Sequence, residues 1–134
     1  MYNFTTSDFL IDNGVITGLT AEGRIKIKDN KGVIDSFPDD ATFIGNGAFA
    51  NVGVTTIKDW GKITKIGDYA FSDNQIAELP DNWGEITNIG DSAFRRNQIT
   101  TLPDNWGKIT SIGNHTFSGN QINGIPEKIG TYQR

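Results

Sequence analysis

Residues 66–88 read IGDYAFSDNQIAELPDNWGEITN, residues 89–111 read IGDSAFRRNQITTLPDNWGKITS, and residues 112–130 read IGNHTFSGNQINGIPEKIG. These copies begin 23 residues apart, and a more divergent copy, IGNGAFANVGVTTIKDWGKITK, precedes them at 44–65. Self-similarity at a fixed period of this length is the signature of a repeat architecture. We number the copies repeats 1 to 4 in chain order.

Each unit carries too few apolar residues to close a core by itself. Stacked copies bury a continuous core, because each unit covers the apolar face of its neighbour. The sequence therefore predicts a repeat solenoid of short β-strands and turns over 44–130, continuous with the rest of the chain as one domain, with residues 131–134 as a tail. In repeat 3 the recurring apolar positions are Ile89, Phe94, Ile99, Leu102 and Ile109.

Glycine and proline mark the bends of each unit. Pro103 follows Leu102 and predicts a short strand that stops there, since proline cannot extend a strand ladder. Gly90, after Ile89, is expected to allow a bend at the end of a strand. Repeat 3 is thus predicted to contain two extended pieces, Gln98–Leu102 and Lys108–Ile112.

Residues 1–43 do not follow the repeat. Two β-prone stretches flank Asn13-Gly14, a pattern typical of a β-hairpin. The stretch Thr20–Lys28 is ambiguous: Thr20 could cap a short helix, whereas Ile25 and Ile27 alternate with lysines as in a half-buried strand. Because the first repeat needs its apolar edge covered, 1–43 is predicted to be an N-terminal cap.

Composition excludes several kinds of chemistry. The 134 residues include no cysteine and one histidine, which excludes thiolate catalysis, disulfides and histidine clusters. A net charge of −4 disfavours binding to nucleic-acid phosphates. We expect no metal, no cofactor and no membrane insertion, and the first residues show no signal-peptide pattern.

The units resemble BspA-like leucine-rich repeats of bacterial surface proteins. The resemblance rests on Ile-Gly-x-x-Ala-Phe at 89–94, followed by Asn97 and by Leu102-Pro103, and on the same pattern in repeat 2. Residues 8–20 also resemble the entry module that precedes such repeats. Isoleucine fills most positions for which the family is named. The resemblance implies a leucine-rich-repeat fold and assigns to its concave side the strands Ile76–Leu79, Ile99–Leu102 and Ile122–Ile125.

Two sets of repeated residues are predicted to hold the stack together. Buried asparagine amides can bond the backbone at bends between coils, and phenylalanines at one position can form a core stack. These structural ladders comprise Asn74, Asn97 and Asn120, and Phe49, Phe71, Phe94 and Phe117.

The tryptophans at one repeat position, Trp60, Trp83 and Trp106, admit two interpretations. They could form an exposed aromatic platform on which sugar rings stack. They could instead roof the core, each indole N–H bonded to a carbonyl, and this interpretation is favoured because Ile129 fills the position in repeat 4.

Positions between the framework residues differ from copy to copy. In a repeat stack such positions pave an exposed surface suited to recognition. The candidate binding residues are Ala77, Glu78, Thr100, Thr101 and Asn123.

The resemblance therefore implies a non-enzymatic adhesion or recognition module of a bacterial cell-surface or secreted protein, with a protein or glycan of a host or neighbouring cell as partner. One alternative is a structural spacer in a larger surface protein. Another is an accessory repeat of an enzyme whose catalytic domain lies elsewhere. The chain ends inside a repeat, which suggests a fragment of a longer protein and a possible dimer through the open C-terminal edge.

Overall fold

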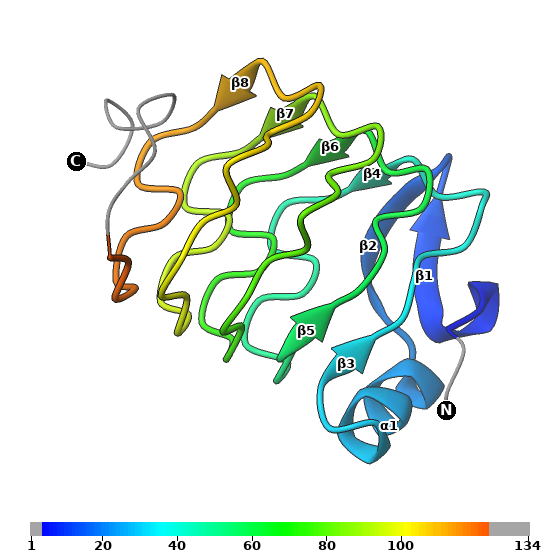
Figure 1. Cartoon of the computed structure of the whole chain (residues 1–134). Helices are drawn as coiled ribbons and strands as arrows, with labels where there is room; N and C mark the ends of the chain where they lie inside the picture. The colour runs from blue at the N-terminus through cyan, green and yellow to red at the C-terminus, as the bar shows by residue number, and fades with distance from the viewer. Residues whose placement is uncertain (1–3, 124–134) are drawn as a thin grey trace.

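The computed structural model describes residues 4–123 and shows successive repeats lying side by side (Figure 1). A short 3₁₀ helix, a hairpin and one α-helix precede them. The elements are η1 (Thr6–Asp8), β1 (Phe9–Asp12), β2 (Val15–Leu19), α1 (Ala21–Asp29), β3 (Val33–Ile34), β4 (Phe43–Ile44), β5 (Thr56–Ile57), β6 (Lys65–Ile66), β7 (Asn88–Ile89) and β8 (Ser111–Ile112).

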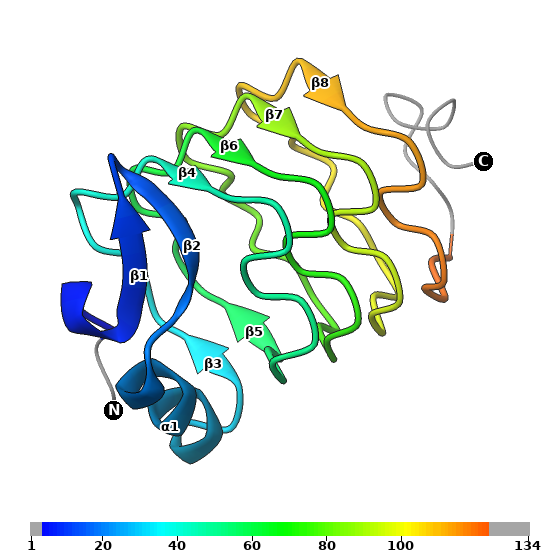
Figure 2. The same cartoon turned by 180° about the vertical axis from the view of Figure 1, so that it is seen from behind.

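One six-stranded mixed sheet runs the length of the molecule in the order β1-β2-β4-β6-β7-β8 (Figures 1 and 2). Only β1 and β2 are antiparallel, and every later pair is parallel. The parallel register places Ile44, Ile66, Ile89 and Ile112 in one row, so the first isoleucine of each repeat occupies the same sheet position. The repeat period is thus also the period of the sheet.

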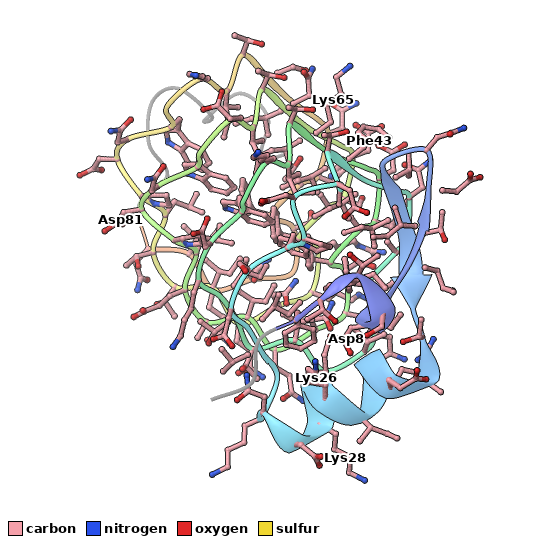
Figure 3. The ribbon with its side chains drawn as sticks, turned by 90° about the vertical axis from the view of Figure 1, so that its right-hand side faces the viewer. Asp8, Lys26, Lys28, Phe43, Lys65 and Asp81 are labelled. Carbon is pink, nitrogen blue, oxygen red and sulfur yellow. The ribbon has the colours of Figure 1, made fainter. Side chains whose placement is uncertain are left out.

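The N-terminal segment contains the predicted hairpin, and its ambiguous stretch is a helix. Asn13 and Gly14 both have positive φ, 52° and 79°, as the tight turn between β1 and β2 requires. Thr20 is the N-cap of α1, and its hydroxyl accepts a hydrogen bond from the Gly23 amide at 3.1 Å. The buried carboxylate of Asp8 pairs with Lys26 at 2.6 Å and ties α1 to η1 (Figure 3).

Aromatic rings form the spine of the core. The four predicted phenylalanines stack with centroid distances of 5.2, 5.4 and 5.7 Å and nearly parallel planes. The tryptophans form a parallel stack at 5.7 and 5.3 Å. At the N-terminal end, Phe9 lies edge-on to Phe49 at 5.9 Å. The hairpin therefore continues the same core into the first repeat.

The strands predicted at 76–79 and 99–102 are absent. Nearer the N-terminus, β3 of the N-terminal segment and β5 of repeat 1 do pair in parallel, and the Lys58 amide donates to the Ile34 carbonyl at 3.0 Å. Buried Leu79 in repeat 2 is equivalent to buried Ile57 in repeat 1, so Pro80 is equivalent to Lys58. Pro80 has no N–H and cannot donate the bond that Lys58 makes. Of the pieces predicted in repeat 3, only the end of Lys108–Ile112 is a strand, and Ile122–Ile125 extends beyond the described residues.

The glycine of each Ile-Gly pair serves close stacking rather than an unusual bend. Gly90 does not have a positive φ. A Cβ atom there would stand 2.5 Å from Asp68 Oδ1 and 2.7 Å from the Asp68 amide nitrogen. Only glycine admits the preceding repeat this closely. Left-handed backbone occurs instead two residues further on, at Ser92 with φ 56°.

Candidate binding surfaces

The asparagine ladder is buried at Asn74 and Asn97 and half-buried at Asn120. Asn97 donates to the carbonyls of Phe71 at 2.9 Å and Phe94 at 3.0 Å, and its Oδ1 accepts from the Ile76 amide at 3.0 Å. One side chain therefore satisfies backbone groups of two adjacent repeats. Asn74 and Asn120 make the equivalent bonds one repeat before and one repeat after. These residues are unavailable to a ligand, since their polar atoms are engaged with the backbone.

The tryptophans are also internal, which excludes the aromatic platform. Trp60 and Trp83 are 1% exposed and Trp106 is 3% exposed, so no indole face is open to a sugar ring. Their apolar area packs against the phenylalanine stack, with Trp60 edge-on to Phe71 at 5.7 Å. The expected carbonyl partners are missing, because all three Nε1 atoms are buried without a hydrogen bond in the described part of the chain.

The five predicted binding residues are all exposed. Glu78 and Thr101, from adjacent repeats, meet at one groove of about 220 Å³, which Leu79, Asp81 and Pro103 also line. The Asn123 amide donates to the Thr100 carbonyl at 2.8 Å, so these two positions are also neighbours. Ala77 lies beside Glu78 in the chain. The structure thus gathers residues spaced one repeat apart on one surface, which we call the variable face: Ala77, Glu78, Thr100, Thr101 and Asn123.

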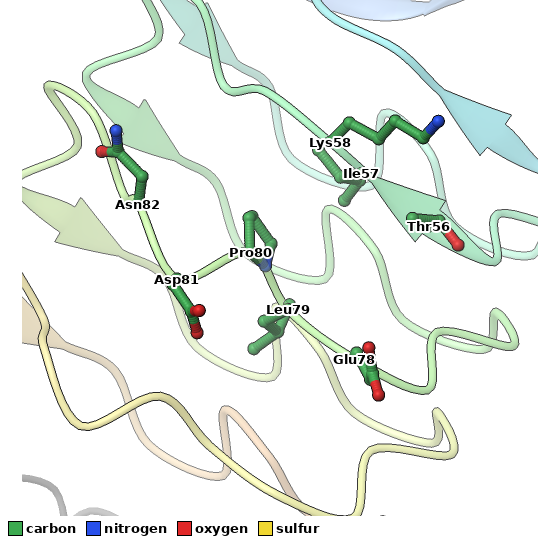
Figure 4. A pocket seen from close by; sticks show the side chains of 8 residues that line it. All are labelled: Thr56, Ile57, Lys58, Glu78, Leu79, Pro80, Asp81 and Asn82. Atoms are coloured by element: carbon green, nitrogen blue, oxygen red, sulfur yellow. The ribbon is translucent and has the colours of Figure 1, made fainter.

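A larger groove of about 400 Å³ adjoins the variable face (Figure 4). Thr56 and Lys58 stand on one side, and Glu78, Pro80 and Asp81 stand on the other. The groove opens where the β3–β5 pairing ends, because no amide from 78–80 reaches β5 in the backbone hydrogen bonding. Lys58 and Asp81 were not predicted as binding residues from the sequence. The sequence did carry a signal that strand pairing ends here: repeats 2 and 3 have Pro80 and Pro103 at the position that Lys58 holds in repeat 1.

A third groove, of about 290 Å³, crosses the six-stranded sheet beside Lys65. It follows a column in which each side chain accepts from the next repeat's backbone: Asn46 from the Asp68 amide, and Asp68 from the Asp91 amide, both at 2.8 Å. The column was visible in the sequence as Asn or Asp two residues after each Ile-Gly isoleucine. One oxygen of each of these side chains bonds the backbone of the next repeat. Only the second oxygen of each carboxylate is therefore available to a ligand.

Within residues 4–123 no three or more histidine, cysteine, aspartate or glutamate side chains gather where they could hold a metal. His115 is exposed and has a left-handed backbone, φ 56°. The described residues also contain no helix with the length and apolarity to cross a bilayer. The predicted dimer through the C-terminal edge concerns residues 124–134 in part, which lie outside the described residues, and it stays a prediction.

Parallel pairing at a fixed period, a stacked aromatic core and internal asparagines define a repeat protein built from short strands. The model of the BspA-type leucine-rich repeat region matches residues 34–130 in six copies, and the chain belongs to this family. The match begins at β3, inside the segment 1–43 that was predicted to be a cap. β3 pairs in parallel with β5, as equivalent strands of adjacent repeats do. No curated protein and no solved structure matches the chain. Regions of this family occur in surface proteins and are generally non-catalytic.

Proposed function

We propose that the chain is a solenoid module that recognises a protein or a glycan on behalf of a bacterial surface protein, and that it has no catalytic activity. The observation that carries the proposal is the variable face. Its side chains are exposed, come from equivalent places in consecutive repeats, and differ in chemical type. Repeat proteins use such extended surfaces for binding, because the framework beneath is fixed by other residues.

The grooves favour recognition over a purely spacing role. Glu78 lines both the 220 Å³ and the 400 Å³ groove, so the variable face is hollowed where its one carboxylate stands. Lys58 and Asp81 place opposite charges around the larger groove. A contact of this size is modest by itself, and several copies on one surface would raise its avidity.

The test is binding to an immobilised panel of extracellular-matrix proteins and host glycans. Thr100→Glu/Thr101→Glu is the variant on the variable face, and Glu78→Gln is a second variant. Thr110→Glu/Ser111→Glu is the matched control, since it adds the same charge at exposed positions around β8. We expect a saturable signal that both variable-face variants reduce and the control retains. Absence of binding by the folded wild-type chain to every member of the panel would refute the proposal and favour a spacer.

A further inference from the structure

A hollow of about 470 Å³ lies between α1 and the repeats that follow it, and none of the variable-face residues lines it. Arg24 and Lys28 reach it from α1, and Lys31 reaches it from the turn after the helix. Ile27, which is buried, and Val52, which is half-buried, supply apolar surface. Gln75 contributes an exposed amide from repeat 2. Residues far apart in the sequence therefore meet at one site.

The backbone around this hollow is fixed. Lys31 and Gly32 have positive φ, 57° and 85°, and the Gly32 amide donates to the Ile27 carbonyl at 2.8 Å, which closes the helix end. Gly32 lies against the Gly53 carbonyl so closely that no Cβ would fit. The Thr55 hydroxyl donates to the Lys31 carbonyl at 2.8 Å. Lys31 is thereby held in place from both sides, and the hollow has a defined wall.

Its charge is uncompensated. No aspartate or glutamate lines the hollow, and Arg24, Lys28 and Lys31 form no ion pair within residues 4–123. In contrast, Lys26 on the same helix is paired with Asp8. The position of Lys28 in the last turn of α1 (Figure 3) suits the helix dipole, but Arg24 precedes that turn and Lys31 lies beyond it. Three unpaired cations around one hollow are unexpected in a chain of net charge −4.

We propose that this hollow binds an anionic glycan, with sulfate or carboxylate groups facing Arg24, Lys28 and Lys31. The sugar ring lies over the apolar surface of Val52, and the Gln75 amide bonds its hydroxyls. The volume is within the range of about 300–1,000 Å³ that is usual for small-ligand sites. An acidic peptide could meet the same three cations, but it fits less well, because no residue lining the hollow belongs to a strand and the peptide backbone would find no strand edge to bond.

The test uses calorimetric titration of the whole chain with a sulfated heparin tetrasaccharide, at low and at high salt. The hollow variant is Arg24→Gln/Lys28→Gln/Lys31→Gln. Each lost charge-assisted contact weakens binding by roughly tenfold, so the variant's Kd should rise by at least about tenfold if one contact is made and by up to roughly a thousandfold if all three are made. High salt should likewise raise the Kd of the wild-type chain, because it screens the charges.

The matched control is Lys62→Gln/Arg96→Gln/Lys108→Gln, which removes three exposed cations that line none of the grooves described above and gives the same net charge. We expect the control to keep the wild-type Kd within about twofold and the desulfated tetrasaccharide to bind weakly or not at all. The proposal is overturned if the wild-type chain does not bind the sulfated sugar, or if both triple variants lose it equally. Binding of an oligo-glutamate peptide as tightly as the sugar would overturn the assignment to a glycan. Thermal unfolding of both variants verifies that they are folded.

Discussion

Removal of the Asn97 side chain tests whether internal amides hold adjacent repeats together. Asn97→Ala deletes two donated bonds and one accepted bond that are buried and 2.9–3.0 Å long, together with a longer, partly buried bond to the Arg95 carbonyl at 3.4 Å. A net contribution of about 1 kcal/mol per buried bond gives about 3 kcal/mol, and the orphaned backbone groups raise the cost further. We expect a loss of about 3–5 kcal/mol from a total stability of about 5–15 kcal/mol.

The assay for Asn97→Ala is urea unfolding followed by tryptophan fluorescence, which reports on the buried indoles. Gln98→Ala is the control, because the adjacent side chain is exposed and should cost no more than about 0.5 kcal/mol. Asn120→Ala removes equivalent bonds that are only partly buried, and it should cost less than Asn97→Ala. A loss at Asn97 below about 1 kcal/mol, or equal to that at Gln98, would show that the internal amides do not hold the repeats together.

Three further substitutions probe the stack by the same unfolding measurement. Gly90→Ala should cost about 1–3 kcal/mol because its Cβ would overlap the preceding repeat, whereas Gly18→Ala, whose Cβ has its nearest neighbour at 3.7 Å, should be tolerated. Phe94→Ala should cost about 3–5 kcal/mol through the lost core ring, and His115→Ala, at an exposed position, about 0.5 kcal/mol or less. Trp83→Phe should cost less than about 1.5 kcal/mol, because it keeps an aromatic ring and removes a buried N–H that has no partner. A loss as large as that of Trp83→Ala would contradict this expectation.

The repeat period was enough to predict which residues meet inside the molecule. Phe71 and Phe94 occupy equivalent positions 23 residues apart, and their rings stack at 5.4 Å. The sequence was less informative about where the strands lie. Both Ile99 and Ile112 stand in short apolar stretches, but only the segment ending at Ile112 pairs as a strand with the preceding repeat. The backbone bonds near Ile99, such as the one from the Gln121 amide to the Ile99 carbonyl at 3.1 Å, do not extend into a strand ladder. Strand formation depends on the neighbouring copy, and Pro80 removes a donor that the pattern of apolar residues does not reveal.

The candidate binding surfaces also differ in how far the sequence could predict them. Thr100 and Thr101 could be predicted as exposed, because they fall between framework residues of a regular unit. The hollow beside α1 could not be predicted, since it depends on the helix at 21–29, which the sequence left ambiguous, and on the approach of Gln75 from another repeat. The burial of Trp83 without an indole partner was also beyond the sequence, because burial and hydrogen bonding are set by separate neighbours.

Residues that recur inside the stack and residues that recur on its surface are under different physical constraints, and this difference bears on recognition. Asn97 bonds to carbonyls of two repeats and Gly90 admits only the backbone it packs against, so a change at either position disturbs the neighbouring copy. Glu78 and Thr101 are exposed, and no hydrogen bond from either side chain supports another repeat within residues 4–123. Changes at Glu78 or Thr101 therefore alter the surface without disturbing the stack. A scaffold with this separation can acquire a new ligand one repeat at a time, which a single-core domain of equal size cannot do as readily.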